Sequence, residues 1–152
     1  MIKEKELSND NYQNAVIELS FLLKIFSLAI KDVMGDAVNI IGVASGREAA
    51  LKMPLNINET DLTICINKIN DYYEGSFDIS SIISDTNIEL SFKKCALKNV
   101  CLQNNNENPD NNLCQLFHAY LNGIMMKFSH RRLKMLSWKL GNVCIANHVI
   151  VA

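Results

Sequence analysis

The sequence predicts an α+β domain in which helices cover one side of an antiparallel sheet. Two long segments, 11–34 and 111–128, have apolar residues at helical spacing. After Gly75 the period changes to that of strands, and β-branched and aromatic residues become frequent. The resulting order is three helices, a hairpin, a helix and a second hairpin, which suits this architecture. A chain of 152 residues predicts one domain over 1–152.

The first helix is expected over 11–34, with Asp10 as its N-cap and Gly35 at its end. Its apolar residues cover more than one stripe, so we expect it to be buried by the rest of the chain or by a partner. A homodimer through this segment follows from the second alternative. Glu18 and Lys24 interrupt its most apolar stretch, which is too short to span a membrane and lacks the features of a signal peptide. We therefore expect no membrane partner.

The second helix is predicted over 36–52, beginning at Asp36 and ending before Pro54. Small residues are frequent in it, and they permit the close approach of another helix or of a ligand. Two interpretations stay open. Gly46 marks a close helix crossing, or this face lines a ligand pocket in which Arg47 holds an anion or pairs with a carboxylate.

A third helix is expected over 58–73, with Asn58 as its cap and Asp61 in its first turn. Cys65 occupies an apolar position of this helix, and a lone thiol at such a position is expected in the core.

The remaining elements follow the change of period. We expect a hairpin over 77–92, an irregular polar loop over 93–110 and a helix over 111–128, capped by its first or second asparagine. A second hairpin is expected from the strands 132–138 and 143–152.

Charge is distributed unevenly along the chain. Residues 1–110 hold all 16 acidic and ten of the 15 basic residues, and residues 111–152 hold the other five basic ones. The basic tail either pairs with the acidic front or forms a basic surface for an anionic partner. No nucleic-acid-binding motif is present and aromatic residues are few, which disfavours a nucleic-acid partner. The candidate surface comprises His130, Arg131, Arg132 and Lys134.

Four of the five cysteines fall in the second half of the chain: Cys95, Cys101, Cys114 and Cys144. Four thiolates are enough for one zinc ion or one iron–sulfur cluster. Cys114 is expected in the first turn of a helix, where exposed N–H groups favour a thiolate. The spacing leaves three interpretations open: a metal or cluster site, a redox disulfide or reactive thiol, and buried inert thiols.

His118 lies one helical turn after Cys114, so both side chains are expected on one face. It is a candidate ligand-binding residue or a core residue. The odd number of cysteines indicates a reducing compartment, and we expect a cytoplasmic protein.

Several short motifs, in order, resemble the 4-vinyl-reductase domain family and its hydrocarbon-binding and methanogen output-domain versions. The resemblance covers about residues 12–150. It rests on Gly35-Asp36, on ASGREAA at 44–50, on CALKNVC at 95–101, on LCQL at 113–116 and on LGNVC at 140–144.

The resemblance implies a fold shared with vesicle-tethering TRAPP subunits, dimerisation through N-terminal helices, and a buried pocket for a small hydrophobic molecule beside a metal. Cys114 and Cys144 match two zinc-binding cysteines of phenol-sensing members. The glutamate and cysteine that those members place before the last cysteine are missing from 133–137. Cys95 and Cys101 could complete a different site, so zinc and an iron–sulfur cluster both stay open.

The sequence therefore predicts a sensory or ligand-binding domain with a cysteine-based metal or redox site, acting through a dimer or a partner protein. One alternative is a reductase or hydrolase that depends on a cluster or on Cys114. Another is a metal-free scaffold subunit. No phosphate-binding loop, serine–histidine–aspartate set or paired-carboxylate pattern supports a particular reaction.

Overall fold

The computed structural model describes residues 9–57, 60–98 and 112–152. Within these ranges the chain is α+β, as predicted. The helical elements are α1 (Asn9–Met34), the 3-10 turn η1 (Gly35–Ala37), α2 (Val38–Lys52), α3 (Leu62–Tyr72) and α5 (Asn112–Ser129). The strands are β1 (Phe77–Ser84), β2 (Asn87–Cys95), β3 (Arg132–Lys139) and β4 (Cys144–Val151).

The four strands form one antiparallel sheet in the order β1-β2-β4-β3. Both predicted hairpins are present, and they join in the middle of the sheet through β2 and β4. In this pairing Phe92 lies opposite Cys144, and Ile88 lies opposite His148. The strands β1 and β3 are consequently the two edges.

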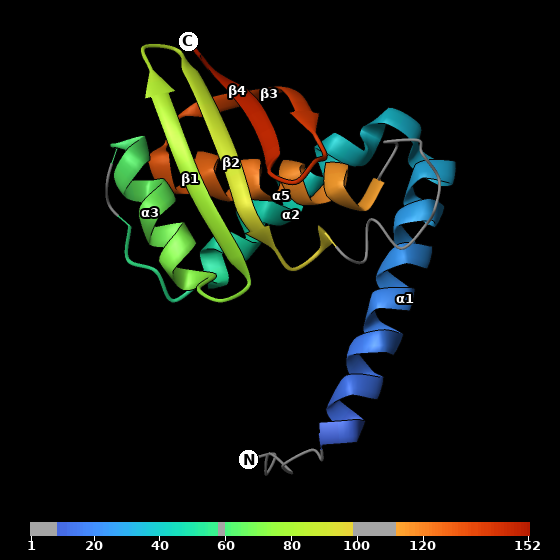
Figure 1. Cartoon of the computed structure of the whole chain (residues 1–152). Coiled ribbons are helices and arrows are strands. Elements are labelled where there is room, and N and C mark those ends of the chain that lie inside the picture. The colour runs from blue at the N-terminus through green and yellow to red at the C-terminus, as the bar shows by residue number, and fades with distance from the viewer. Residues whose placement is uncertain (1–8, 58–59, 99–111) are drawn as a thin grey trace.

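Helices cover one face of this sheet, which confirms the predicted layering. In Figure 1, α5 crosses behind the strands, α2 lies behind it, and α3 lies beside β1. The alternation of buried residues along β2 and β4 marks the covered face, because successive side chains of a strand point to opposite faces. The buried residues of these two strands are Ile88, Leu90, Phe92, Cys144, Ala146 and His148.

Glycines allow α2 and α5 to cross closely. A Cβ atom on Gly46 would overlap the backbone carbonyl of Tyr120, and one on Gly123 would overlap the carbonyl of Val43. A Cβ atom on Gly42 would overlap the Cβ atom of Ala119 on the facing helix as well. Gly46 therefore marks a close helix crossing, the first of the two interpretations of the small-residue segment.

The third helix begins later than expected. Asp61 is its N-cap and not a first-turn residue: its Oδ1 accepts hydrogen bonds from the backbone N–H groups of Thr63 and Ile64, at 2.8 and 3.2 Å. The expected cap, Asn58, lies outside the described residues. Cys65 is 0% exposed, so its assignment to the core is confirmed.

The first helix projects away from the rest of the molecule (Figure 1). Its apolar side chains are not covered by the chain itself: Ile17, Phe21 and Phe26 are 64%, 56% and 61% exposed. The expectation that the protein's own body buries this helix is therefore wrong for the side chains described, because only its C-terminal end meets the body. In the described part of the chain, no helix combines the length and the apolar character needed to cross a bilayer.

Candidate functional site

The structure places three of the four predicted metal-site cysteines. Cys95 ends β2, Cys114 lies buried in the first turn of α5, and Cys144 begins β4. The Sγ atom of Cys144 donates to the backbone carbonyl of Gly141 at 3.8 Å. Cys101 lies outside the described residues.

These cysteines do not form a complete metal centre in the part of the chain that the structure describes. Among those residues, no three histidine, cysteine, aspartate or glutamate side chains gather closely enough to hold a metal ion. No disulfide joins any two of the four described cysteines. A site made with Cys101 stays a prediction.

His118 is a core residue, 5% exposed, on the sheet-facing side of α5. Its ring lies 5.0 Å from that of Phe92 and 5.8 Å from that of Trp138, measured between centroids. Burial and, to a smaller extent, the proximity of His148 lower the pKa of His118 to about 4. The imidazole is therefore neutral at pH 7, and its Nδ1 has no hydrogen-bond partner among the described residues.

A second buried imidazole was missed by the sequence reasoning. His148 lies on the covered face of β4 and is 1% exposed. Neither of its ring nitrogens makes a hydrogen bond of good geometry with a described group. Burial lowers its pKa to about 4, an effect that the backbone at Ala146 partly offsets. Its place two residues after Ala146 and four after Cys144 gives it their inward orientation, which strand alternation could have indicated.

Asn122 is the third buried polar side chain with an unpartnered atom. It follows His118 by one turn of α5 and is 3% exposed. Its Nδ2 donates to the backbone carbonyl of Leu133 on β3 at 3.3 Å, whereas its Oδ1 has no partner among the described residues. An unmet buried acceptor costs about 1–3 kcal/mol, so a donor brought by a ligand would be stabilising here.

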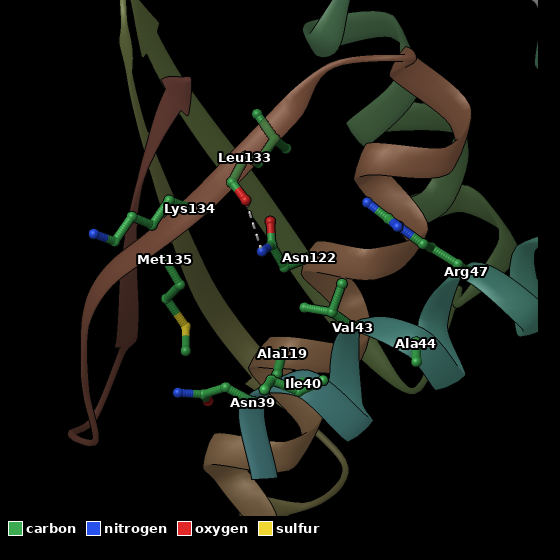
Figure 2. A pocket seen from close by; sticks show the side chains of 10 residues that line it. All are labelled: Asn39, Ile40, Val43, Ala44, Arg47, Ala119, Asn122, Leu133, Lys134 and Met135. Carbon is green, nitrogen blue, oxygen red and sulfur yellow. Dashed lines mark hydrogen bonds between the residues drawn. The ribbon is translucent and has the colours of Figure 1, made fainter. Parts of the chain in front are cut away.

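Asn122 lines a groove of about 450 Å³ between α2, α5 and β3, which we call the α2–β3 groove. This volume falls within the ~300–1,000 Å³ that is typical of small-molecule sites. Figure 2 shows the residues of the three elements around it, with the side chain of Lys134 directed away from α2. The lining residues are Asn39, Ile40, Val43, Ala44, Arg47, Ala119, Asn122, Leu133, Lys134 and Met135.

The groove is apolar with two cationic side chains. Ile40 and Val43 come from α2, Ala119 from the α5 floor, and the two cations are Arg47 on α2 and Lys134 on β3. The lining contains no acidic residue, so nothing in it neutralises these charges. Arg47, predicted as a ligand-binding residue, thus lies in the groove, whereas neither His118 nor Cys114 lines it.

The edge of β3 itself forms one wall. Leu133, Lys134 and Met135 are consecutive and all line the groove. Successive side chains of a strand point to opposite faces, so three in a row can meet one groove only if the strand's edge faces it. Backbone N–H and C=O groups are consequently part of the binding surface.

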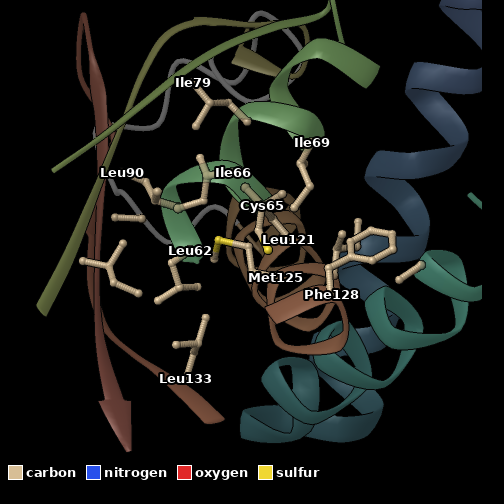
Figure 3. Close-up of a cluster of buried hydrophobic side chains, with 14 of the residues drawn as sticks. Leu62, Cys65, Ile66, Ile69, Ile79, Leu90, Leu121, Met125, Phe128 and Leu133 are labelled. Carbon is tan, nitrogen blue, oxygen red and sulfur yellow. The ribbon is translucent and has the colours of Figure 1, made fainter. Parts of the chain in front are cut away.

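The main apolar core offers no comparable space. It lies between α3, α5 and the sheet, where side chains such as Cys65, Leu121 and Met125 interdigitate (Figure 3). Leu121 and Met125 are among its most buried members. The α2–β3 groove is therefore the better candidate for a ligand.

The groove can bind but shows no catalytic set. Its lining, taken over the described residues, has no serine, cysteine, histidine, aspartate or glutamate that could act as nucleophile or general base. Apolar walls, two cations and amide groups suit recognition of an amphipathic anion.

No protein-family model matches the chain, and no curated protein matches it. The resemblance to the 4-vinyl-reductase family therefore stays a prediction.

Proposed function

We propose that the chain is a non-catalytic ligand-binding domain whose α2–β3 groove takes a small organic anion with an apolar body. The observation that supports this proposal is the groove itself: about 450 Å³, with apolar walls, two cations and no acidic residue. It agrees with the sequence-based expectation of a sensory domain for a small hydrophobic molecule.

The apolar walls and the cations of the groove would each contribute to binding. Burying the apolar body against Ile40 and Val43 contributes about 25 cal/mol for each Å² removed from water. The planar guanidinium of Arg47 can bind a carboxylate through two parallel hydrogen bonds, and Lys134 adds a second positive charge.

A dodecanoate titration tests the proposal, with displacement of anilinonaphthalene sulfonate fluorescence as the readout. We expect saturable binding at one site, weakened at least tenfold by Arg47→Gln and to a smaller extent by Lys134→Gln, because a hydrogen bond to a charged group contributes about 1.5–3 kcal/mol. Arg132→Gln and Lys139→Gln are matched controls, because they remove the same charges outside the lining. Equal weakening by all four variants would show that binding follows net charge and not the groove.

We further propose that a second copy of the chain covers α1. The support is a helix of 26 residues with large apolar side chains exposed along its length. A sensory domain could signal through such an interface or through a partner protein.

The same exposed helix also supports the scaffold alternative, which needs an apolar assembly surface and no ligand. Dodecanoate binding separates the two, because a scaffold would show self-association without saturable uptake of the probe. The enzyme alternative has less support, because neither Cys114 nor His118 lines the groove.

The cysteine site is a separate part of the proposal. Cys95, Cys101, Cys114 and Cys144 would hold zinc or an iron–sulfur cluster, which would require the three described cysteines to come closer together than they are in this structure. Support comes from the place of Cys114 at the N-terminus of α5, where the helix dipole favours a thiolate.

A further inference from the structure

Backbone groups on the outer edge of β3 are open to pairing. Leu133 directs its carbonyl away from β4, because Asn122 Nδ2 donates to it from α5. In an antiparallel ladder the groups that face one side recur every second residue, and the pairing is regular from Arg132 to Met135. The N–H and C=O of Met135 therefore face outward too, and no hydrogen bond to them occurs among the described residues.

The opposite edge of the sheet is different. On β1 the outward N–H of Ile79 donates to Asn70 Oδ1 of α3 at 2.7 Å, and α3 packs against this strand. Natural sheets protect edges in this way, because an unpaired edge is a template for another strand. On the edge of β3, the only backbone group of the described residues that pairs with a side chain in this way is the carbonyl of Leu133, which accepts from Asn122.

The space beside the open edge can hold an extended chain. The α2–β3 groove lies between β3 and α2, with α5 as its floor (Figure 2). A strand added next to Met135 would direct alternate side chains toward Ile40 and Val43. Arg47 lies across the groove from β3, and no acidic lining residue would repel a negative charge on the added strand.

We propose that the edge of β3 binds an extended peptide segment of a partner protein as a fifth strand, one that has alternating apolar side chains and an acidic residue or a carboxyl terminus. Hydrogen bonds to Met135 give the pairing, the apolar walls select the side chains, and Arg47 with Lys134 select the negative charge. The charge complementarity of the groove favours this occupant over a second copy of the same strand, which would bring Lys134 against its own charge.

This docking also explains how a bound small molecule could be read by another protein. This inference rests on the proposed function: the small anion and the peptide would compete for the same groove. Filling of the groove by the anion would release the peptide, which gives a domain with no catalytic set an output.

The binding test uses the full chain and a fluorescein-labelled hexapeptide of alternating valine and threonine with a C-terminal aspartate and a free carboxylate. Fluorescence anisotropy is recorded without dodecanoate and then with it. A second peptide of the same sequence carries N-methyl groups on the amides that would pair with β3. We expect saturable binding of the first peptide, at least tenfold weaker binding of the second, and release of the first by dodecanoate.

Proline variants locate the pairing on the edge. Met135→Pro removes an outward N–H and leaves the ladder with β4 intact, so it should weaken peptide binding at least tenfold. Ser81→Pro is the matched control: it removes an outward N–H from β1, two residues after Ile79, and should leave binding unchanged. Circular dichroism verifies that both variants keep the fold. Hydrogen exchange should show that the peptide slows exchange at Met135 in the unaltered chain.

The outcomes separate the two proposals. Absence of peptide binding at about 1 mM, or equal binding of the N-methylated peptide, would overturn the edge pairing, whatever dodecanoate does. Concentration-dependent dimerisation that Met135→Pro abolishes, without peptide binding, would assign the edge to a second copy and overturn the partner peptide. Peptide binding that saturating dodecanoate leaves unchanged would overturn the competition alone. Peptide binding by a chain that takes up no dodecanoate would refute only the small-molecule function.

Discussion

The imidazole of His118 faces the indole of Trp138 in the layer between α5 and the sheet, with ring centroids 5.8 Å apart and planes inclined by 32°. Trp138 is the single tryptophan of the chain, so its fluorescence reports on this layer alone. That makes several properties of the interior measurable without a label.

Acid should destabilise the protein through its two buried histidines. The pKa values of His118 and His148 are lowered to about 4, whereas an unfolded histidine titrates near 6.5. The unfolded state therefore binds more protons between these values. The free energy of unfolding falls as the pH drops from about 6.5 to about 4, by roughly 1.4 kcal/mol per pH unit for each histidine. Urea unfolding followed by Trp138 fluorescence measures this slope.

Removing one of these histidines should flatten the pH dependence. His148→Leu eliminates a titrating group and two unpartnered ring nitrogens, so we expect about half the slope. His130→Leu is the control, because it removes an exposed imidazole and not a buried one. An unaltered slope in His148→Leu would mean that His148 is not buried and neutral.

Added volume at the helix crossing should be destabilising. Gly46→Ala and Gly123→Ala each place a methyl group on backbone of the facing helix, which can move only if α2 and α5 separate. Overpacking of this kind costs about 1–3 kcal/mol and occasionally more, so thermal unfolding should begin several degrees lower. Ser45→Ala, on an exposed position of α2, should have no such effect. Wild-type stability of both glycine variants would contradict the crossing.

The N-cap of α3 should be measurable by mutation. Asp61→Ala removes the acceptor for two backbone N–H groups, and loss of such a cap costs about 0.5–2 kcal/mol. Asp71→Ala removes the same charge from the other end of α3, where a negative charge opposes the helix dipole, and should be neutral or slightly stabilising. Chemical denaturation of the pair decides whether Asp61 is the cap.

A charge on the exposed face of α1 should prevent self-association. Ile17→Glu or Phe21→Glu would bury a carboxylate against a second copy, which is strongly unfavourable unless the charge is paired. We expect a dimer of the unaltered chain to become a monomer in light-scattering measurements during size-exclusion chromatography. Ser45→Glu adds the same charge at an exposed polar position of α2, outside α1, and tests whether charge alone is responsible. A monomeric unaltered chain would remove the dimer proposal.

The cysteine site predicts a bound metal in protein purified without oxygen. Elemental analysis should find about one zinc or one cluster per chain, and Cys114→Ala or Cys144→Ala should reduce it. Cys65→Ala is the comparison, because Cys65 lies in the apolar core. Colourless, metal-free and fully folded protein would remove the metal site.

Local patterns predicted the elements of this fold better than its site. The spacing of apolar residues was sufficient to predict α5, and its observed start at Asn112 agrees with a cap at the first of the two asparagines. The change of period after Gly75 was sufficient to predict the position of the first hairpin. The start of α3 was missed because both Asn58 and Asp61 are good caps, and only the observed hydrogen bonds choose between them.

The site could not be predicted whole because it is assembled from distant segments. Arg47 was proposed from its small-residue surroundings, but Lys134 was considered only as part of a basic surface. Neither could be placed in a groove without the pairing of β3 with β4 and the crossing of α2 over α5. The exposure of α1 was equally beyond the sequence, because an apolar helix looks the same whether its own body or a partner covers it.

The unequal edges of the sheet limit what the protein can build. A filament that grows by strand addition needs two open edges on every chain, one to give and one to receive. Here the Ile79 N–H is already taken by Asn70, and α3 stands against β1. Addition of a strand along β1 would have to displace the Asn70 side chain, so growth of a filament beyond the first step at β3 should be disfavoured.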